Sequence, residues 1–470
     1  MNEQNIFYTV ILDRFFHEFQ SITYHGVPIC KFVYYAIIKN WTLELAKENP
    51  VYFKNLQDEM NRLRDSETYD RLDEPYIYEP HPDGIILMRG GFGDLASLFL
   101  PKERFFLISP NQGEVNIIGQ NLPGFPAHNI QDYFRENPKA VQSLNQRFTQ
   151  KFAGLKDDPL LGNPKLQEWF QQTMPAIVSM LDAVQSLFEN LRVGTVLTIA
   201  SAYSMDGALN LIARANRIPS LTVQHGILDE CNLLYNFPIL ATKKAVWGSA
   251  IRNLYQKFGV PESRIAVVGS PRFDIILNQK WWGKAKLCQM LQIDPAKKVV
   301  VYAAQIFHFA QTVTPVILEG LQSIPDLFLL ILLHPGENPV PHEELAKGYP
   351  NCKVIRFGHV SLYNALSGAD CFITYYSTSA FEAMYFQLPV ITVEPMPPKF
   401  SFGDLGVSLK VENSVELRKI LIRLFSEEAF RLNAVNRYQK FIASYCIPDG
   451  LASKRLFDEV DLLCRTGGTV

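Results

Sequence analysis

The stretch that decides the fold is CFITYYSTSAFEAMYFQLPVITVEP, residues 371–395. It predicts a buried strand over 371–374, a turn rich in hydroxyl groups, a helix, and a second strand over 390–393. Phe381 and Met384 recur at the spacing of one helix face. A strand, a helix and a strand in this order are typical of an α/β fold with a parallel sheet.

The hydroxyl turn consists of Ser377, Thr378 and Ser379. It favours a phosphate site, because free backbone N–H groups and the positive end of a helix dipole face that place. The alternative is that these hydroxyls only cap the helix. Glu382 follows one turn later and is placed to accept hydrogen bonds from ribose hydroxyls.

Length, charge and cysteine usage narrow the class of protein. A chain of 470 residues is too long for one ordinary core, so we expect two α/β domains. The net charge of −2 gives no reason to expect nucleic-acid binding. Seven cysteines without a CxxC pair indicate buried thiols in a reducing compartment, not disulfides or a zinc site. With no signal-peptide pattern and no membrane-spanning apolar run, we expect a cytoplasmic protein.

The first 190 residues carry few chemical signals. Residues 1–80 are rich in aromatics and predict a helical cap over the first domain, with a surface that touches a membrane or partner as the alternative. In GIILMRGGFGDLASLFL (84–100) a strand precedes glycines that we interpret as a tight turn beside an acceptor. Residues 125–190 predict a polar segment and then helices.

From Val193 strands and helices alternate, which predicts parallel strands joined by right-handed crossovers. Asp206 lies in the loop after one strand, and His225 directly follows the next. Because the carboxyl ends of parallel strands meet at one edge of a sheet, we expect both to face one crevice. The strands expected here are 196–200, 220–223, 244–247 and 265–268, with a helix over 208–216.

A second α/β unit begins near Lys297, and its polar residues again follow strand ends. Gln305 follows the first strand and His334 the second. The tail over 414–463 predicts helices that pack on, or cross back to, the first domain. The five strands expected for this doubly wound sheet are 299–303, 328–333, 354–357, 371–374 and 390–393.

Two such domains facing a cleft suit a nucleotide-activated donor on one side and an acceptor on the other. His334 and the hydroxyl turn can stabilise the charge that develops on a departing nucleotide phosphate without a metal. The sequence contains no DxD pair, so it does not indicate a bound divalent ion. Asp206 or His225 can act as the general base on an acceptor hydroxyl, with Asp229 as a third choice.

Each of these residues also has a purely structural interpretation. Asp206 before a glycine can form a turn, and His225 can bond to backbone. Arg272 contacts a phosphate or pairs with Asp274 or a carbonyl. Gln305 contacts a ligand or closes its own loop.

Five stretches carry a resemblance to a known group: TVQHGI (222–227), VVGSPRFD (267–274), LLHPGE (332–337), ITYYSTSAFEAMYFQLPVI (373–391) and IPDGLASKRLFDEV (447–460). The chain resembles the metal-independent GT-B glycosyltransferases of bacterial surface polysaccharide synthesis, including polysialyltransferases and Kdo transferases. It is also similar to the CDP-glycerol glycerophosphotransferases of teichoic acid synthesis.

The resemblance implies a GT-B fold. The expected domains are an acceptor-side domain over 1–270, a nucleotide-donor domain over 271–430, and C-terminal helices over 431–470 that pack back on the first domain. It places the donor phosphate on His334 and on Ser377, Thr378 and Ser379. The polysialyltransferase base lies in an acidic pair before glycine, of which only Asp206 is matched here.

The expected function is therefore transfer of a sugar, with a CMP-linked acidic sugar favoured, from a nucleotide donor to a glycan or lipid-linked glycan. No further cofactor or metal is expected. Peripheral association with the inner face of the cytoplasmic membrane stays open. The alternatives are a CDP-glycerol-type glycerophosphotransferase, then a UDP-sugar 2-epimerase, then a catalytically inactive GT-B scaffold.

Overall fold

A computed structural model describes residues 3–41, 67–122, 124–230, 233, 237–334, 337–356, 358–398 and 400–470. Part of the expected N-terminal helical region (42–66) and Pro335 and Gly336 of the HPGE motif lie outside the described residues. Contacts divide the chain into two units. Unit 1 comprises Met1–Gly269 and Ser453–Val470, and unit 2 comprises Ser270–Ala452.

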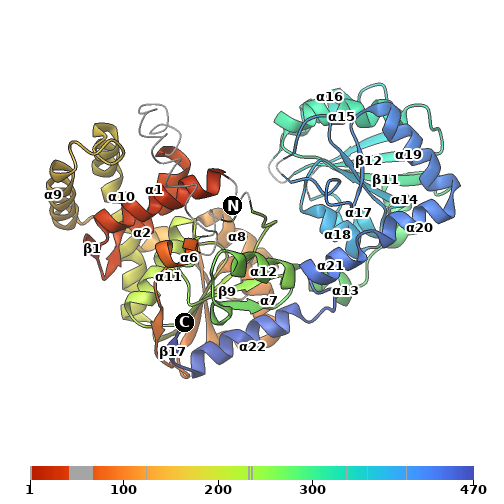
Figure 1. The fold of residues 1–470 in the computed structure, drawn as a ribbon. Helices are drawn as coiled ribbons and strands as arrows, with labels where there is room; N and C mark the ends of the chain where they lie inside the picture. Colours follow the sequence, from red (N-terminus) through yellow and green to blue (C-terminus); the bar gives the residue numbers. More distant parts are fainter. Residues whose placement is uncertain are drawn as a thin grey trace. The chain divides into compact units, whose positions relative to one another are not determined.

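Unit 1 is built on a parallel sheet whose described residues form seven strands, in the order β10-β9-β8-β7-β4-β5-β6. Figure 1 shows this unit with strand β9 of the sheet labelled. Counted along the chain from β4, this is the doubly wound order, with the switch point between β4 and β7. The strands are β4 (Ile85–Arg89), β5 (Phe105–Ser109), β6 (Ala127–Asn129), β7 (Val193–Thr198), β8 (Ser220–Val223), β9 (Lys243–Val246) and β10 (Ile265–Val267).

The sequence pattern did not predict β5 and β6. At the glycine loop the structure has a tight turn: Gly90–Phe92 forms a single 3₁₀ turn, η2, that leads straight into α7 (Gly93–Phe99). Close packing explains why residue 90 is a glycine, because an added Cβ would lie 2.3 Å from the side chains of Ile118 and Ser109.

The helical elaboration of unit 1 has its own aromatic core. Phe148 and Phe170 stack with ring centroids 4.5 Å apart, and Phe19 packs on both. The helices of unit 1 also include α1 (Glu3–Phe19), α2 (Ile29–Phe32), α3 (Tyr34–Ala36), η1 (Ile37–Trp41), α6 (Glu67–Leu72), η3 (Lys102–Arg104), α8 (Gln112–Asn121), η4 (Ile130–Tyr133), α9 (Pro138–Gly154), α10 (Pro164–Asn190), α11 (Ser204–Ala215), α12 (Ser249–Lys257), η6 (Glu262–Arg264) and α22 (Ala452–Arg465).

Two small antiparallel pairs complete unit 1: β1 (Thr23–Tyr24) with β2 (Val27–Pro28), and β3 (Ile77–Tyr78) with β17 (Gly468–Thr469). The end of the chain is integral to this unit. Leu456, Val460 and Leu463 of α22 are buried in the same apolar cluster as Ile86 and Leu197 of the sheet.

Unit 2 has a parallel sheet whose described residues form six strands, in the order β13-β12-β11-β14-β15-β16. All five expected strands are present, and β16 is a sixth that the sequence analysis missed. The switch point lies between β11 and β14. The strands are β11 (Lys298–Ala303), β12 (Leu327–Leu332), β13 (Cys352–Ile355), β14 (Cys371–Thr374), β15 (Val390–Val393) and β16 (Leu409–Val411).

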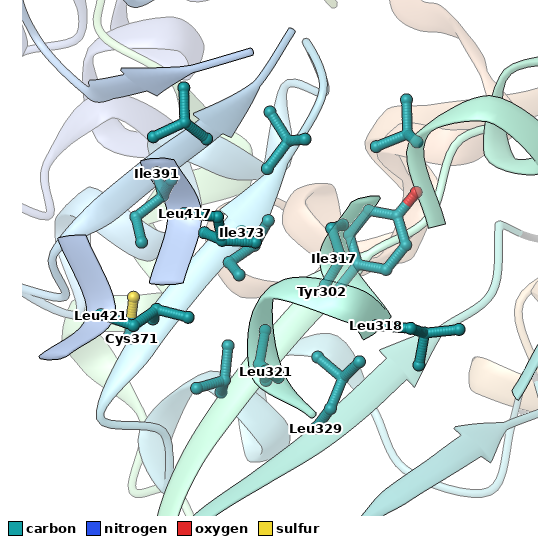
Figure 2. Close-up of a cluster of buried hydrophobic side chains, with 14 of the residues drawn as sticks. Tyr302, Ile317, Leu318, Leu321, Leu329, Cys371, Ile373, Ile391, Leu417 and Leu421 are labelled. Atoms are coloured by element: carbon teal, nitrogen blue, oxygen red, sulfur yellow. The ribbon is translucent and has the colours of Figure 1, made fainter. Parts of the chain in front are cut away.

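Helices cover this sheet because the strands are apolar on both faces. On one face Leu417 and Leu421 of α19 pack with Ile373 and Ile317 into a buried hydrophobic cluster, shown in Figure 2. The helices of unit 2 are α13 (Pro271–Asn278), α14 (Gly283–Leu291), α15 (Phe307–Leu321), α16 (Pro339–Ala346), α17 (Leu362–Ser367), α18 (Ser379–Tyr385), α19 (Ser414–Ser426), α20 (Glu428–Asn436) and α21 (Gln439–Tyr445).

The expected α/β class with two parallel sheets is confirmed. Among the helices that the structure describes, none is both long and apolar enough to cross a membrane.

Candidate functional site

A cavity of about 550 Å³ lies within unit 2, at the carboxyl ends of β11, β12, β13 and β14. This is where doubly wound sheets bind ligands, because the chain leaves β11 and β14 in opposite directions there. One part of its wall is apolar, with Leu333, Ile355 and Val360. The polar wall residues are Arg272, His334, Arg356, Ser361, Ser377, Thr378 and Ser379.

The hydroxyl turn follows β14 directly and forms part of this wall. The Ser377 N–H donates to Oγ1 of Thr374 at 3.3 Å, which fixes the start of the turn. Ser379 donates to Oγ of Ser377 from its N–H at 3.3 Å and from its hydroxyl at 2.8 Å. Thr378 is the N-cap residue of α18, yet its side chain makes no capping bond. The turn is thus held in shape by its own hydroxyls.

His334 follows β12 and is exposed on the cavity wall. Further along the chain, Glu337 accepts a hydrogen bond from the Phe307 N–H at 3.0 Å. The carboxylate of Glu337 also lies 3.5 Å from Nε2 of the buried His342. These contacts connect Glu337 to the first residue of α15 and to α16.

Arg272 and Glu382 form an ion pair in which the guanidinium donates to Oε1 of the carboxylate. The Arg272 side chain is 53% exposed and lies on the cavity wall, whereas the Glu382 side chain is 0% exposed and is not part of that wall. From the sequence we expected Glu382 to bind a ribose and Arg272 to contact a phosphate, with pairing to Asp274 or a carbonyl as the alternative for Arg272. In the structure the two side chains contact each other, and Arg272 lies on the cavity wall.

Gln305 follows the carboxyl end of β11, as expected, but it is not among the residues that line the cavity. Arg356 and Ser361 do line it and were not predicted. Arg356 comes directly after β13, so the rule that singled out His334 after β12 applies to it equally. Its guanidinium donates to Oε1 of Glu343 at 2.9 Å.

In unit 1 the structure places Asp206 in the first turn of α11, which begins before the predicted start at 208. Its side chain is 0% exposed, and its Oδ2 accepts a hydrogen bond from Nη1 of Arg89 at 2.9 Å. Arg89 also donates to both carboxylate oxygens of Glu114, at 3.3 and 3.1 Å. The pair lies at the switch point between β4 and β7.

Burial dominates the proton affinities of this cluster. It raises the pKa of the Asp206 carboxyl to about 6, although the Arg89 guanidinium opposes the shift. It lowers the pKa of the buried Lys244 ammonium to about 7, and there the charge of Asp206 opposes the shift. Both groups therefore change charge near neutral pH.

His225 follows β8 and is exposed at the same edge of the sheet. Its neighbour Gln224 fixes the loop, because Oε1 of Gln224 accepts from the Trp247 N–H at 3.0 Å and its Nε2 donates to the Gly226 carbonyl at 2.9 Å. The His225 and Tyr203 rings lie 6.0 Å apart between centroids.

Tyr203 in turn links His225 to the buried ion pair, because Cζ of Arg89 lies 5.6 Å from its ring centroid. Arg89 and Tyr203 were not predicted, although the position of each in the sequence pattern could have indicated a site residue. Arg89 is the last residue of a strand, and Tyr203 immediately precedes the helix that carries Asp206. Asp206 and His225 thus lie at one edge of one sheet, as expected, but Asp206 is buried and His225 exposed.

Residues 248–397 match the family described as CDP-Glycerol:Poly(glycerophosphate) glycerophosphotransferase. This range contains every residue on the cavity wall of unit 2. No curated protein sequence matches the chain significantly.

Solved structures with a similar fold include two epimerases and a glycosyltransferase. The UDP-GlcNAc 2-epimerase from Neisseria meningitidis, bound to UDP-GlcNAc, aligns with a TM-score of 0.56 and 15% identity over 80% of this chain and 99% of the epimerase. The UDP-GlcNAc 2-epimerase from Methanocaldococcus jannaschii aligns with a TM-score of 0.53 and 14% identity over 80% of this chain and 99% of the epimerase. A glycosyltransferase from Rickettsia africae ESF-5 aligns with a TM-score of 0.51 and 11% identity over 82% of this chain and 100% of the glycosyltransferase. The chain therefore has the two-sheet α/β fold that GT-B glycosyltransferases and these epimerases share.

Proposed function

We propose that this protein is a nucleotide-dependent transferase that moves a glycerophosphate-type group from a CDP-linked donor to a hydroxyl acceptor. One observation carries the proposal. The family match over 248–397 encloses the whole cavity of unit 2, whose polar wall offers the hydroxyls and cations that a nucleotide phosphate needs.

In this reaction the acceptor oxygen attacks the phosphorus that bears the glycerol. The bond between that phosphorus and the bridging oxygen breaks, CMP leaves with the electron pair, and a base takes the acceptor proton. His334, Arg272 and the hydroxyl turn would stabilise the charge on the departing CMP. The apolar wall near Ile355 and Val360 would hold the nucleobase.

The base would come from unit 1. His225 is better placed than Asp206, because it is exposed whereas the Asp206 carboxylate is buried and bound to Arg89. Asp206 would then act on the reaction through Arg89 and Tyr203, whose ring neighbours His225.

A second candidate is glycosyl transfer from a nucleotide sugar, including a CMP-linked acidic sugar. It is favoured by the single turn of hydroxyls with one His, which suits a donor that carries one phosphate. In that reaction the bond between the sugar carbon and the phosphate oxygen breaks, so CMP leaves intact in both cases and only the transferred group differs.

A thermal-shift titration with CMP, CDP, CDP-glycerol, UDP, GDP and ADP, each with and without EDTA, tests the proposal. A ligand that binds only the folded protein increases the free energy of unfolding by mass action, by about 2.7 kcal/mol at a ligand concentration of a hundred times Kd, and so raises the melting midpoint. We expect CDP and CDP-glycerol to stabilise most, and CMP to be released when an acceptor is added. Selective binding of CMP would favour the acidic-sugar donor, a UDP response would favour a hexose donor or epimerase, and silence throughout would favour an inactive scaffold.

A further inference from the structure

We propose that Glu382 is a positioning residue that holds the Arg272 guanidinium against the donor phosphates, and that it does not bind the ribose. This inference rests on the proposed nucleotide-dependent function and deepens it. It assigns phosphate recognition to an ion pair between α13 and α18. The two residues of this pair belong to two different sequence motifs, 267–274 and 373–391.

The burial of the two side chains carries the first step. A ribose ligand must present its carboxylate to the cavity, but the Glu382 side chain has no exposed surface and is not on the cavity wall. Its Oε1 is already occupied by Arg272. Its Oε2 is buried without a hydrogen-bond partner among the described residues. The carboxylate is therefore directed at Arg272.

Arg272 has the opposite situation. Just over half of its side chain is exposed, and it shares the cavity wall with His334 and the hydroxyl turn. A guanidinium has five N–H donors in a planar fork, so binding Glu382 leaves donors for a second anion. Fixing it in advance also removes much of the entropy that a long side chain loses when it binds.

The backbone of Arg272 is anchored as well. The next residue, Phe273, packs on Phe381 and Tyr385 of α18, with ring centroids 6.1 and 5.1 Å apart. Burial raises the pKa of Glu382, and the Arg272 guanidinium opposes this shift, so the cation also favours the ionised carboxylate. Tyr363 lies close enough to both side chains to interact with their charges. The pair is thus a fixed element of the cavity.

The two roles for Glu382 predict different losses of affinity. A ribose ligand discriminates CDP from 2′-deoxy-CDP, and its loss should leave the deoxynucleotide almost unaffected. A residue that positions Arg272 acts on the phosphates, so its loss should weaken both nucleotides equally. It should also have no further effect once Arg272 is gone.

The experiment is calorimetric titration of CDP, 2′-deoxy-CDP and CMP into the full-length wild type and into the variants Glu382→Gln, Arg272→Gln, Arg272→Lys and the Arg272→Gln/Glu382→Gln double variant. We expect each Gln variant to raise the Kd for both CDP forms roughly tenfold or more, since hydrogen bonds to charged groups are lost. Arg272→Lys should recover part of the affinity, because it keeps the charge but not the fork. The double variant should bind as weakly as Arg272→Gln alone.

A Glu382→Gln variant that loses affinity for CDP but not for 2′-deoxy-CDP would make Glu382 a ribose ligand and overturn the proposal. Unchanged affinities in both Gln variants would reduce the pair to a contact between helices, which also overturns it. If Glu382→Gln does not fold, the double variant decides, because it leaves no buried charge unpaired. A double variant that binds CDP more weakly than Arg272→Gln, with 2′-deoxy-CDP unaffected, would then make Glu382 a ribose ligand. A wild type that binds no nucleotide would instead remove the proposed function, so the two failures are distinct.

Discussion

Nη1 of Arg89 lies 2.9 Å from Oδ2 of Asp206, and this contact joins the end of β4 to the first turn of α11 at the switch point of the unit 1 sheet. Both oxygens of Glu114 bind the same guanidinium. Three ionisable groups from different segments therefore meet here, and the Asp206 side chain among them is fully buried. The Asp206 carboxylate should therefore bind its proton at a different pH in the folded and unfolded protein.

The first prediction concerns Asp206. Its folded pKa of about 6 exceeds the ordinary 3.8, so the folded state binds this proton more tightly than the unfolded chain. Its contribution to stability is full below about pH 4 and is lost as the pH rises through 6, up to about 3 kcal/mol. Urea unfolding at several pH values should show that the free energy of unfolding of Asp206→Asn increases relative to that of the wild type from pH 4 to 7. A constant difference over that range would contradict the shift.

Lys244 should have the opposite dependence. Its folded pKa of about 7 lies below the ordinary 10.5, so its contribution is present above 10.5 and is lost as the pH falls through 7. Lys244→Met should therefore become more stable than wild type as the pH falls from 9 to 6, by about 1–4 kcal/mol in urea unfolding. Lys419→Met on the exposed face of α19 is the matched control and should show no such trend. Equal curves for both variants would refute the prediction.

His334→Ala should weaken nucleotide binding, because the proposed phosphate site loses a donor from the cavity wall. The expected rise in Kd for CDP is roughly tenfold to a hundredfold, measured by calorimetry. His308→Ala is the control, since His308 is exposed and is not on the cavity wall. Normal affinity in His334→Ala would remove this residue from the site.

The base assignment predicts a split between binding and turnover. His225→Ala should lower turnover by roughly 10²- to 10⁴-fold while CDP affinity stays unchanged, because His225 lies in unit 1 and the cavity in unit 2. Asp206→Asn should have a smaller effect than His225→Ala if it acts only through Arg89. Full turnover in both variants would show that neither residue serves the reaction.

The core of unit 2 predicts a large cost for a buried truncation. Ile373 on β14 is fully buried in the cluster of Figure 2, so Ile373→Ala should destabilise the protein by about 2–5 kcal/mol. Ile422 on α19 is 50% exposed, and Ile422→Ala should stay within about 0.5 kcal/mol of wild type. Similar losses in the two variants, compared by urea unfolding, would mean that this cluster does not carry the stability of unit 2.

Local pattern predicted most of both sheets, because long apolar runs such as 299–303 and 328–333 are unambiguous. It missed β6, which has only three residues, and β5, whose five residues follow a charged turn. It found His334 and the hydroxyl turn, which follow strand ends, but it missed Arg356 after β13, and it did not predict which side chains pair with each other. Arg89 and Asp206 are 117 residues apart, and Arg272 and Glu382 are 110 apart, so only the folded sheet brings each pair together. The domain limits 1–270, 271–430 and 431–470 and the roles of the site residues stay predictions.

The placement of α22 in the core of unit 1 has a consequence for biosynthesis. Leu456 and Val460 fill a cluster with strands made far earlier in the chain, so unit 1 cannot bury this core until the ribosome has translated all of unit 2. At 5–20 residues per second this leaves a partly open sheet for roughly 10 to 40 s. During that interval Ile86, Leu197 and their neighbours are exposed to chaperones, while unit 2 is free to fold first.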